Sequence, residues 1–258
     1  MTARNFLVRG LLVGLLSGFA AFLVAHQVGE PHVDTAIALE EANAAADAAP
    51  ADHSGSSEED AGPVVSRANQ STWGLLTGTL PLGTVLGGFV ALLAAMAAGR
   101  LGRLSPVQST AVVAAIGFVS YSLVPFLKYP ANPPAVGNPD TIGTRSSSYF
   151  ALVLISVVVA VAAVLAARAA APRLGGLRAC VLALVGYVAL VSLAVVLLPT
   201  VDEVGDFPGD TLWAFRVSSL LTLAAMWSVI GIGLALAVDR LAAQDRAVAD
   251  RRAFAASL

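Results

Sequence analysis

The residues of this chain that could bind a metal are concentrated in one polar stretch, residues 26–72. All three histidines of the chain lie there, together with nine carboxylates. Imidazole suits borderline divalent ions such as Co²⁺, Ni²⁺ and Zn²⁺, whereas carboxylates alone favour Ca²⁺ or Mg²⁺. The mixture therefore favours a transition metal. The candidate ligands are Glu30, His32, Asp34, Glu40, His26 and His53.

Part of this stretch has helical spacing. Pro31 can open a helix, and a helix beginning there places Glu30, Asp34 and Glu41 on one face. The histidines are six and 21 residues apart, so they form no His-x3-His pair. A solvated acidic loop, partly disordered, explains the same composition equally well.

A second polar segment, residues 128–143, contains four prolines within ten residues. Proline removes backbone donors and holds the chain extended, so we expect a rigid segment. Its carbonyls and polar side chains could line an ion path, or the segment could simply set the spacing of two helices. The candidates are Lys128, Pro130, Asn132, Pro133, Pro134 and Asp140.

A third polar segment, residues 199–211, contains four acids and no base, and Arg216 follows it. An unpaired arginine in a membrane span is costly, so we expect Arg216 to pair with Asp206 or Asp210, or to extend toward water. A structural ion pair is the favoured role, with gating as the alternative. Asp210 and Arg216 complete the ion-path candidates.

The elements that must position these groups are membrane spans. The chain is 57% hydrophobic and 12% charged, whereas soluble domains carry about 25% charged residues. About 20 apolar residues cross the hydrocarbon core as a helix. Runs of that kind occur at residues 6–25, 73–98, 107–127, 149–167, 179–198 and 212–238. The sequence therefore predicts one all-α membrane domain of about six helices, with residues 26–72 as an outer loop.

The sorting of charge along the chain predicts its orientation. Alternate connections, together with both ends of the chain, hold eleven of the 15 Lys and Arg residues; the other connections hold 14 of the 17 acids. Basic connections stay in the cytoplasm, so both termini are predicted cytoplasmic and the three polar segments face outward. The first run also fits a signal peptide, although Leu23 and Ala25 form a poor cleavage pattern.

The sequence shows no means of catalysis. It has no phosphate-binding loop, dinucleotide fingerprint or nucleophile elbow, and its one cysteine, Cys180, excludes a disulfide within the chain. We expect no enzyme activity, no cofactor and no nucleic-acid partner. Pro81 and Pro125 are expected to interrupt their helices and free backbone carbonyls.

Several motifs in the polar segments resemble those of the CbtA family of predicted cobalt-transporter subunits. They are Gly29-Glu30-Pro31 with Asp34, Ala36-Ile37 and Glu40; Val65-Ser66-Arg67; Lys128 to Gly137; Asp140 to Gly143 with Arg145; and Phe207-Pro208 with Asp210, Leu212-Trp213 and Phe215-Arg216. The resemblance covers nearly the whole chain, and the proline segment is its most specific part. It favours Glu30, Asp34 and Glu40 over His32 as metal ligands.

The resemblance implies a multi-pass protein of the cytoplasmic (inner) membrane that supplies cobalt for cobalamin synthesis. It also implies a small single-span, histidine-bearing partner of the CbtB type. We therefore expect a subunit of a divalent-metal uptake system, in which the outer loops capture cobalt and pass it between the helices. The alternatives are a metal-binding sensor or assembly scaffold that transports nothing, and a transporter of another solute.

Overall fold

The computed structural model describes residues 2–47 and 65–257. Within those ranges the chain is helical and has no strand. The helices are, in order, α1 (Ala3–Val24), η1 (Ala25–Gly29), α2 (Glu30–Asp47), α3 (Arg67–Asn69), η2 (Gln70–Gly74), α4 (Leu75–Ala97), α5 (Pro106–Gly117), η3 (Phe118–Leu123), α6 (Val124–Lys128), η4 (Pro139–Thr141), α7 (Ile142–Leu174), α8 (Gly176–Leu197) and α9 (Gly209–Ala256). Six helical stretches of the described chain are long and apolar enough to cross a membrane, which confirms the predicted fold class.

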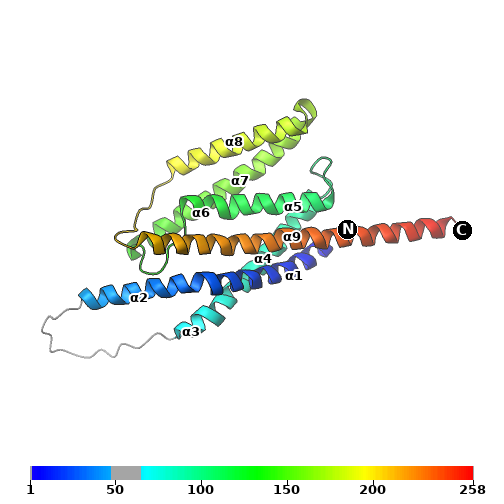
Figure 1. Cartoon of the computed structure of the whole chain (residues 1–258). Helices are drawn as coiled ribbons and strands as arrows, with labels where there is room; N and C mark the ends of the chain where they lie inside the picture. Colours follow the sequence, from blue (N-terminus) through cyan, green and yellow to red (C-terminus); the bar gives the residue numbers. More distant parts are fainter. Residues whose placement is uncertain (1, 48–64, 258) are drawn as a thin grey trace.

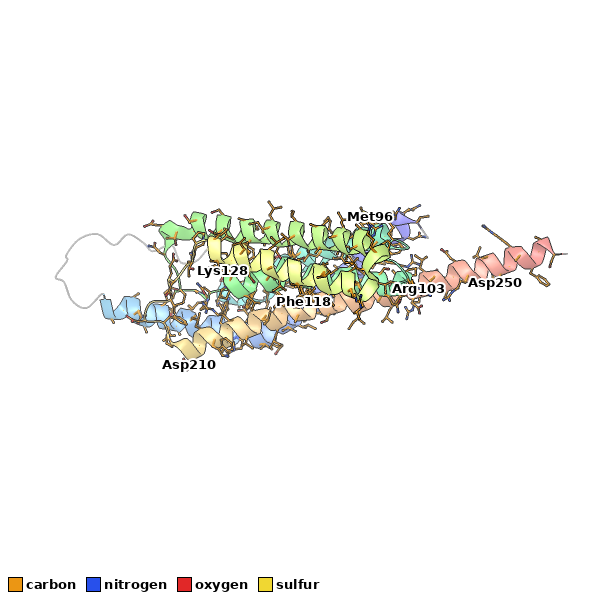
Figure 2. All side chains as sticks on the ribbon, turned by 90° about the horizontal axis from the view of Figure 1, so that it is seen from above. Met96, Arg103, Phe118, Lys128, Asp210 and Asp250 are labelled. Atoms are coloured by element: carbon orange, nitrogen blue, oxygen red, sulfur yellow. The ribbon has the colours of Figure 1, made fainter. Side chains whose placement is uncertain are left out.

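The polar connections fall at two opposite ends of the bundle. One end carries α2, α3 and the connections 129–141 and 198–208, and the other carries the start of α1, the turn 98–105 and the extension of α9 (Figure 1). Figure 2 accordingly shows Lys128 and Asp210 at the end opposite to Arg103 and Asp250. We call these the acidic end and the basic end. Placement of the basic end in the cytoplasm stays a prediction.

Helices α1 and α4 pack in antiparallel contact through glycines. Gly10, Gly14 and Gly18 recur every four residues along α1, and they face Gly87, Gly83 and Thr79 of α4. A Cβ added at Gly87 would lie 2.5 Å from the carbonyl oxygen of Gly10, and one at Gly18 would lie 2.5 Å from that of Thr79. Lipid supplies no hydrophobic force between helices, so such close backbone packing is a main source of association.

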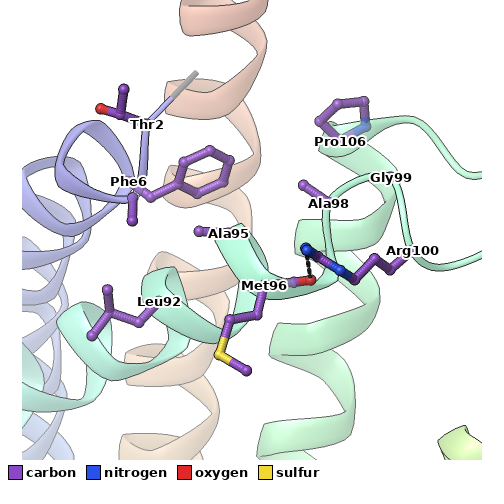
Figure 3. Close-up of a pocket in the computed structure, with 10 residues that line it drawn as sticks. Thr2, Phe6, Leu92, Ala95, Met96, Ala98, Gly99, Arg100 and Pro106 are labelled. Carbon is purple, nitrogen blue, oxygen red and sulfur yellow. Dashed lines mark hydrogen bonds between the residues drawn. The ribbon is translucent and has the colours of Figure 1, made fainter.

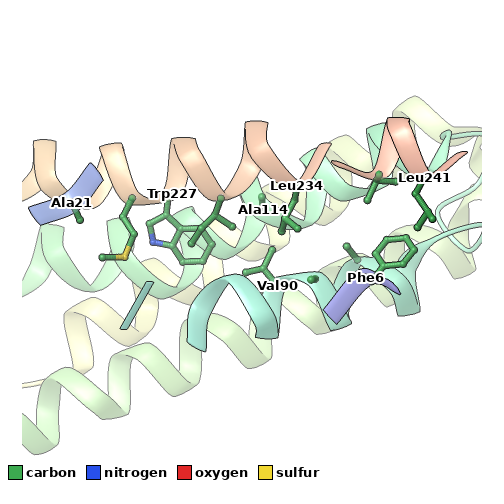
Figure 4. Packing of buried hydrophobic residues seen from close by; sticks show 12 residues of the cluster. Phe6, Ala21, Val90, Ala114, Trp227, Leu234 and Leu241 are labelled. Atoms are coloured by element: carbon green, nitrogen blue, oxygen red, sulfur yellow. The ribbon is translucent and has the colours of Figure 1, made fainter. Parts of the chain in front are cut away.

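The largest apolar cluster lies where α9 crosses α1, α4 and α5 (Figure 4). Its members on α9 recur at helical spacing and are fully or almost fully buried: Met226, Trp227, Ile230, Leu234, Val238 and Leu241. Helices α7 and α8 pair with each other and carry a smaller cluster around Tyr187, whose hydroxyl lies 2.8 Å from Ser156 Oγ. The outward face of α8 is apolar and exposed, as expected for a helix in contact with lipid.

Two widened helical turns are explained by prolines. Glu30 N–H bonds the carbonyl of Ala25 and Val124 N–H bonds that of Val119, each five residues back, and proline follows directly at positions 31 and 125. Proline lacks an N–H and clashes with the carbonyl four residues earlier, so one extra residue in the turn relieves the clash. Pro81 behaves differently, since α4 continues through it without interruption.

Several helices extend beyond the apolar runs that predicted them. The first helix continues through η1 into α2, and α9 runs on to Ala256. Both extensions are rich in alanine with Glu or Arg, which favour a helix even where the segment is too polar for lipid. The polar stretch after Ala25 therefore begins as a helix that continues the first span.

Candidate functional site

Two candidate metal ligands at the acidic end share one arginine. Glu30 and Asp34 lie one turn apart on α2, and Arg67, the first residue of α3, pairs with both. The Nε atom of Arg67 donates to Asp34 Oδ1 over 3.0 Å, and its Nη2 atom pairs with Glu30 Oε2. The Glu30 side chain is 14% exposed and that of Asp34 63%. Two carboxylates and one guanidinium leave this group with a net charge of about −1.

His26, in η1, contacts η2, the helical turn that follows α3. Its Nδ1 atom lies 2.9 Å from the carbonyl oxygen of Ser71, and its ring stacks on Phe22 with centroids 5.5 Å apart. A carbonyl only accepts hydrogen bonds, so Nδ1 is the donor in this contact. Metal-binding histidines commonly have this arrangement, with one ring nitrogen held by a backbone carbonyl.

The other proposed ligands are not gathered around this group. His32 is half-buried on α2 and Glu40 is exposed further along the same helix. His53 lies outside the described residues. In the part of the chain that the structure describes, no three His, Cys, Asp or Glu side chains lie close enough together to hold a metal.

The proline segment, residues 128–143, is joined by hydrogen bonds to the connection between α8 and α9. Tyr129 Oη donates to the carbonyl oxygen of Pro199 over 2.7 Å, and Lys128 Nζ bonds Thr200 Oγ1 over 3.0 Å. Pro133 is buried, and Pro130 and Pro134 are half-buried. These contacts favour a stiff segment that sets the spacing of helices.

An ion pair fastens the same two connections at a second point. Glu203 Oε2 accepts from the backbone N–H of Asn138 over 2.9 Å and lies 3.3 Å from Arg145 Nη1. Asn138 also accepts from Asp140 N–H through its side chain, which turns the segment into η4. Gly137, at φ 121°, lies directly against the Arg145 guanidinium, where a Cβ would clash. Hydrogen bonds from Thr141 and Asn138, with the Arg145 charge, lower the pKa of Glu203.

This lowered pKa predicts that the contact of Glu203 with Asn138 and Arg145 weakens in acid. A carboxyl group whose pKa is lower in the folded protein stabilises it fully above the ordinary pKa of Glu, and the stabilisation disappears as pH falls through the folded value. We expect Glu203→Gln to lower the thermal midpoint at pH 7 and to reduce its decline between about pH 5 and pH 3. Thermal scans in detergent test this, with Asp206→Asn in the same connection as control. Equal acid sensitivity in both variants would contradict it.

Arg216 does not form the ion pair expected for it. Its guanidinium Nη2 donates to Asn132 Oδ1 over 2.9 Å, and its Nε is buried with no hydrogen-bond partner. Neither Asp206 nor Asp210 forms a salt bridge with it in the described chain; Asp210 instead accepts from its neighbour's amide, Thr211 N–H. The prediction was wrong because the proline segment folds over the start of α9 and presents an amide there.

The four bases in the connections of the acidic end each bond one segment of the chain to another. Arg67, Lys128, Arg145 and Arg216 each bond a residue at least seven positions away in a different helix or connection. Lys128 and Arg216 were predicted as ion-path candidates, whereas Arg67 and Arg145 were noted only as members of the family motifs. For Arg67 and Arg145 a signal was present in the sequence, since isolated bases among many acids are natural ion-pair partners.

The spans themselves offer few polar groups. Trp227 Nε1 donates to Ser122 Oγ in η3 over 2.8 Å, and both side chains are buried. No Asp, Glu or His occurs in any of the six apolar runs of the sequence. A cation crossing this chain alone would therefore meet no carboxylate and no imidazole within these runs.

A protein-family model described as "Probable cobalt transporter subunit (CbtA)" matches residues 3–239. The chain belongs to the CbtA family. Neither a curated protein nor a solved structure matches it. The match covers the six spans and the connections 129–141 and 198–208. It ends at Asp239, so most of the long extension of α9 lies beyond it. The six spans and this family indicate a multi-pass membrane protein, and the family description, a probable cobalt transporter subunit, agrees with the predicted class of function.

Proposed function

We propose that this CbtA protein is the membrane subunit of a divalent transition-metal uptake system, with Co²⁺ as cargo captured at its acidic end. The observation that carries the proposal is the pair of carboxylates Glu30 and Asp34, both held by Arg67 at the acidic end. A divalent ion bound to the two carboxylates would take the place of the Arg67 guanidinium, so that two positive charges replace one. The remaining ligands are water or groups of a partner subunit.

The route through the membrane also requires a partner. The spans contain no carboxylate and no histidine, so this chain by itself offers a dehydrated cation little compensation. We propose a small single-span partner of the CbtB type, in the cytoplasmic (inner) membrane, as the source of the missing ligands. A membrane potential negative inside supplies about 2.3 kcal/mol per charge per 100 mV, so entry of a divalent cation needs no ATP.

Uptake of cobalt-57 into metal-depleted cells tests the proposal. Cells expressing the chain alone, the chain with its small partner, and neither protein are compared at equal expression. We expect accumulation at least about ten-fold above empty membranes only when both proteins are present. No uptake in any combination, with both proteins confirmed in the membrane, would reject the transport function.

A second function is a membrane metal sensor or assembly scaffold that moves no ion. It is favoured by the apolar spans and by the lack of a three-ligand group in the described chain. This alternative predicts that purified protein binds Co²⁺ at the acidic end while uptake stays at the level of empty membranes.

A further inference from the structure

A cavity lies at the basic end of the described chain, and none of the candidate metal ligands lines it. Its volume is about 630 Å³, and it is an open hollow lined by the start of α1, the end of α4 and the start of α5 (Figure 3). Phe6, Leu92, Ala95 and Met96 form apolar walls, and Arg100 stands at its edge. This size is within the range of small-ligand sites.

The charge at the cavity is positive and uncompensated. Arg100 Nη1 donates to the carbonyl oxygen of Met96 over 2.8 Å, and within the described residues the guanidinium has no carboxylate partner. Ala3 also lines the cavity, and as the first residue of α1 its amide has no acceptor within the helix. Arg4, which follows Ala3 in α1 and has no salt bridge within the described residues, adds to the positive potential.

The apolar side of the cavity is continuous with the lipid-facing surface. Met96 is 66% exposed and Leu92 is 37% exposed, and both belong to the membrane-spanning part of α4. An occupant can therefore lie partly in the cavity and partly in the bilayer. A soluble anion would leave these walls in contact with water, and a neutral lipid would leave Arg100 without a counter-charge.

We propose that this cavity binds an anionic phospholipid, with its phosphate at Arg100 and the first amides of α1 and its acyl chain along Phe6, Leu92 and Met96. Basic pockets between membrane helices recognise anionic headgroups in this way, because the phosphate compensates the arginine while the chain stays in hydrocarbon. The site is independent of the metal-uptake proposal, since it uses the opposite end of the bundle.

Lipid titration of the purified full chain in detergent, followed by native mass spectrometry, tests the site. The probes are phosphatidylglycerol and phosphatidylcholine with identical acyl chains, and inorganic phosphate. We expect phosphatidylglycerol to bind roughly five-fold more tightly than phosphatidylcholine and Arg100→Ala to abolish that difference. Arg103→Ala removes the same charge three residues away, outside the cavity, and is expected to leave the difference intact. Leu92→Trp fills the cavity and is expected to weaken both lipids.

Three results would overturn the proposal. Equal losses in Arg100→Ala and Arg103→Ala would indicate diffuse attraction to the basic end. Competition by inorganic phosphate at concentrations comparable to the lipid would indicate a site for a soluble anion. Unchanged lipid binding in Leu92→Trp, which keeps Arg100 in place, would show that no lipid chain enters the cavity.

Discussion

Gly87→Leu is expected to prevent stable assembly of the helix bundle. The new side chain would have to occupy space held by the backbone of α1, because a Cβ at this position already lies 2.5 Å from the Gly10 carbonyl oxygen. Overpacking in a core that can repack costs about 1–3 kcal/mol. Backbone atoms cannot change rotamer, so α1 and α4 must separate, and we expect a loss of more than about 3 kcal/mol. Size-exclusion chromatography and thermal scans in detergent measure the effect.

Gly78→Leu provides the matched control for this prediction. Gly78 lies on the same helix, and a Cβ there would meet nothing within 4 Å. Leucine is the better helix former by about 1 kcal/mol, so this variant is expected to be neutral or slightly more stable. Equal midpoints for the two variants would show that the α1–α4 glycine contact does not support the fold.

Glu30→Gln combined with Asp34→Asn is expected to reduce cobalt uptake by at least about ten-fold when the partner is present. The change keeps the shape of both side chains and removes their charge, and loss of even a supporting group costs 10–100-fold in metal affinity. Uptake of cobalt-57 at a subsaturating concentration measures it. Asp250→Asn, which removes one carboxylate charge at the basic end, is the control for loss of negative charge away from the proposed site.

Arg67→Ala separates two roles of these carboxylates. If they bind the metal, removing the competing guanidinium leaves both carboxylates free, and uptake is maintained or increased. If they serve only to fasten α2 to α3, Arg67→Ala breaks the same ion pairs and lowers uptake as much as the double variant does. The latter result would contradict capture at Glu30 and Asp34 while leaving the transport function itself open to the partner-dependence test.

Much of the architecture follows from local properties of the sequence. Six apolar runs bounded by charge predict six spans, because the hydrocarbon thickness sets the number of apolar residues that each helix needs. The separation of acidic from basic connections also follows, since consecutive spans alternate in direction. The helix at Glu30–Asp34 and its shared carboxylate face were likewise predicted from spacing alone, and α2 contains both.

The pairing of charged groups could not be predicted in the same way. Arg216 meets Asn132, 84 positions away, rather than the neighbouring Asp206 or Asp210, and Arg67 meets Glu30 across 37 positions. Such partners are decided by which helix ends lie side by side. That arrangement depends on the backbone contact between α1 and α4 and on the widened turns before Pro31 and Pro125.

The sequence by itself therefore determined the spans, the two charged ends and the family, because hydrophobic length, charge and motif are properties of short segments. Only the tertiary structure decided that Glu203 and Arg145 fasten the proline segment, that Arg67 occupies the candidate ligands, and that a cavity opens beside Arg100. Each of these depends on distances between segments remote in the chain, and those distances exist only once the helices have packed.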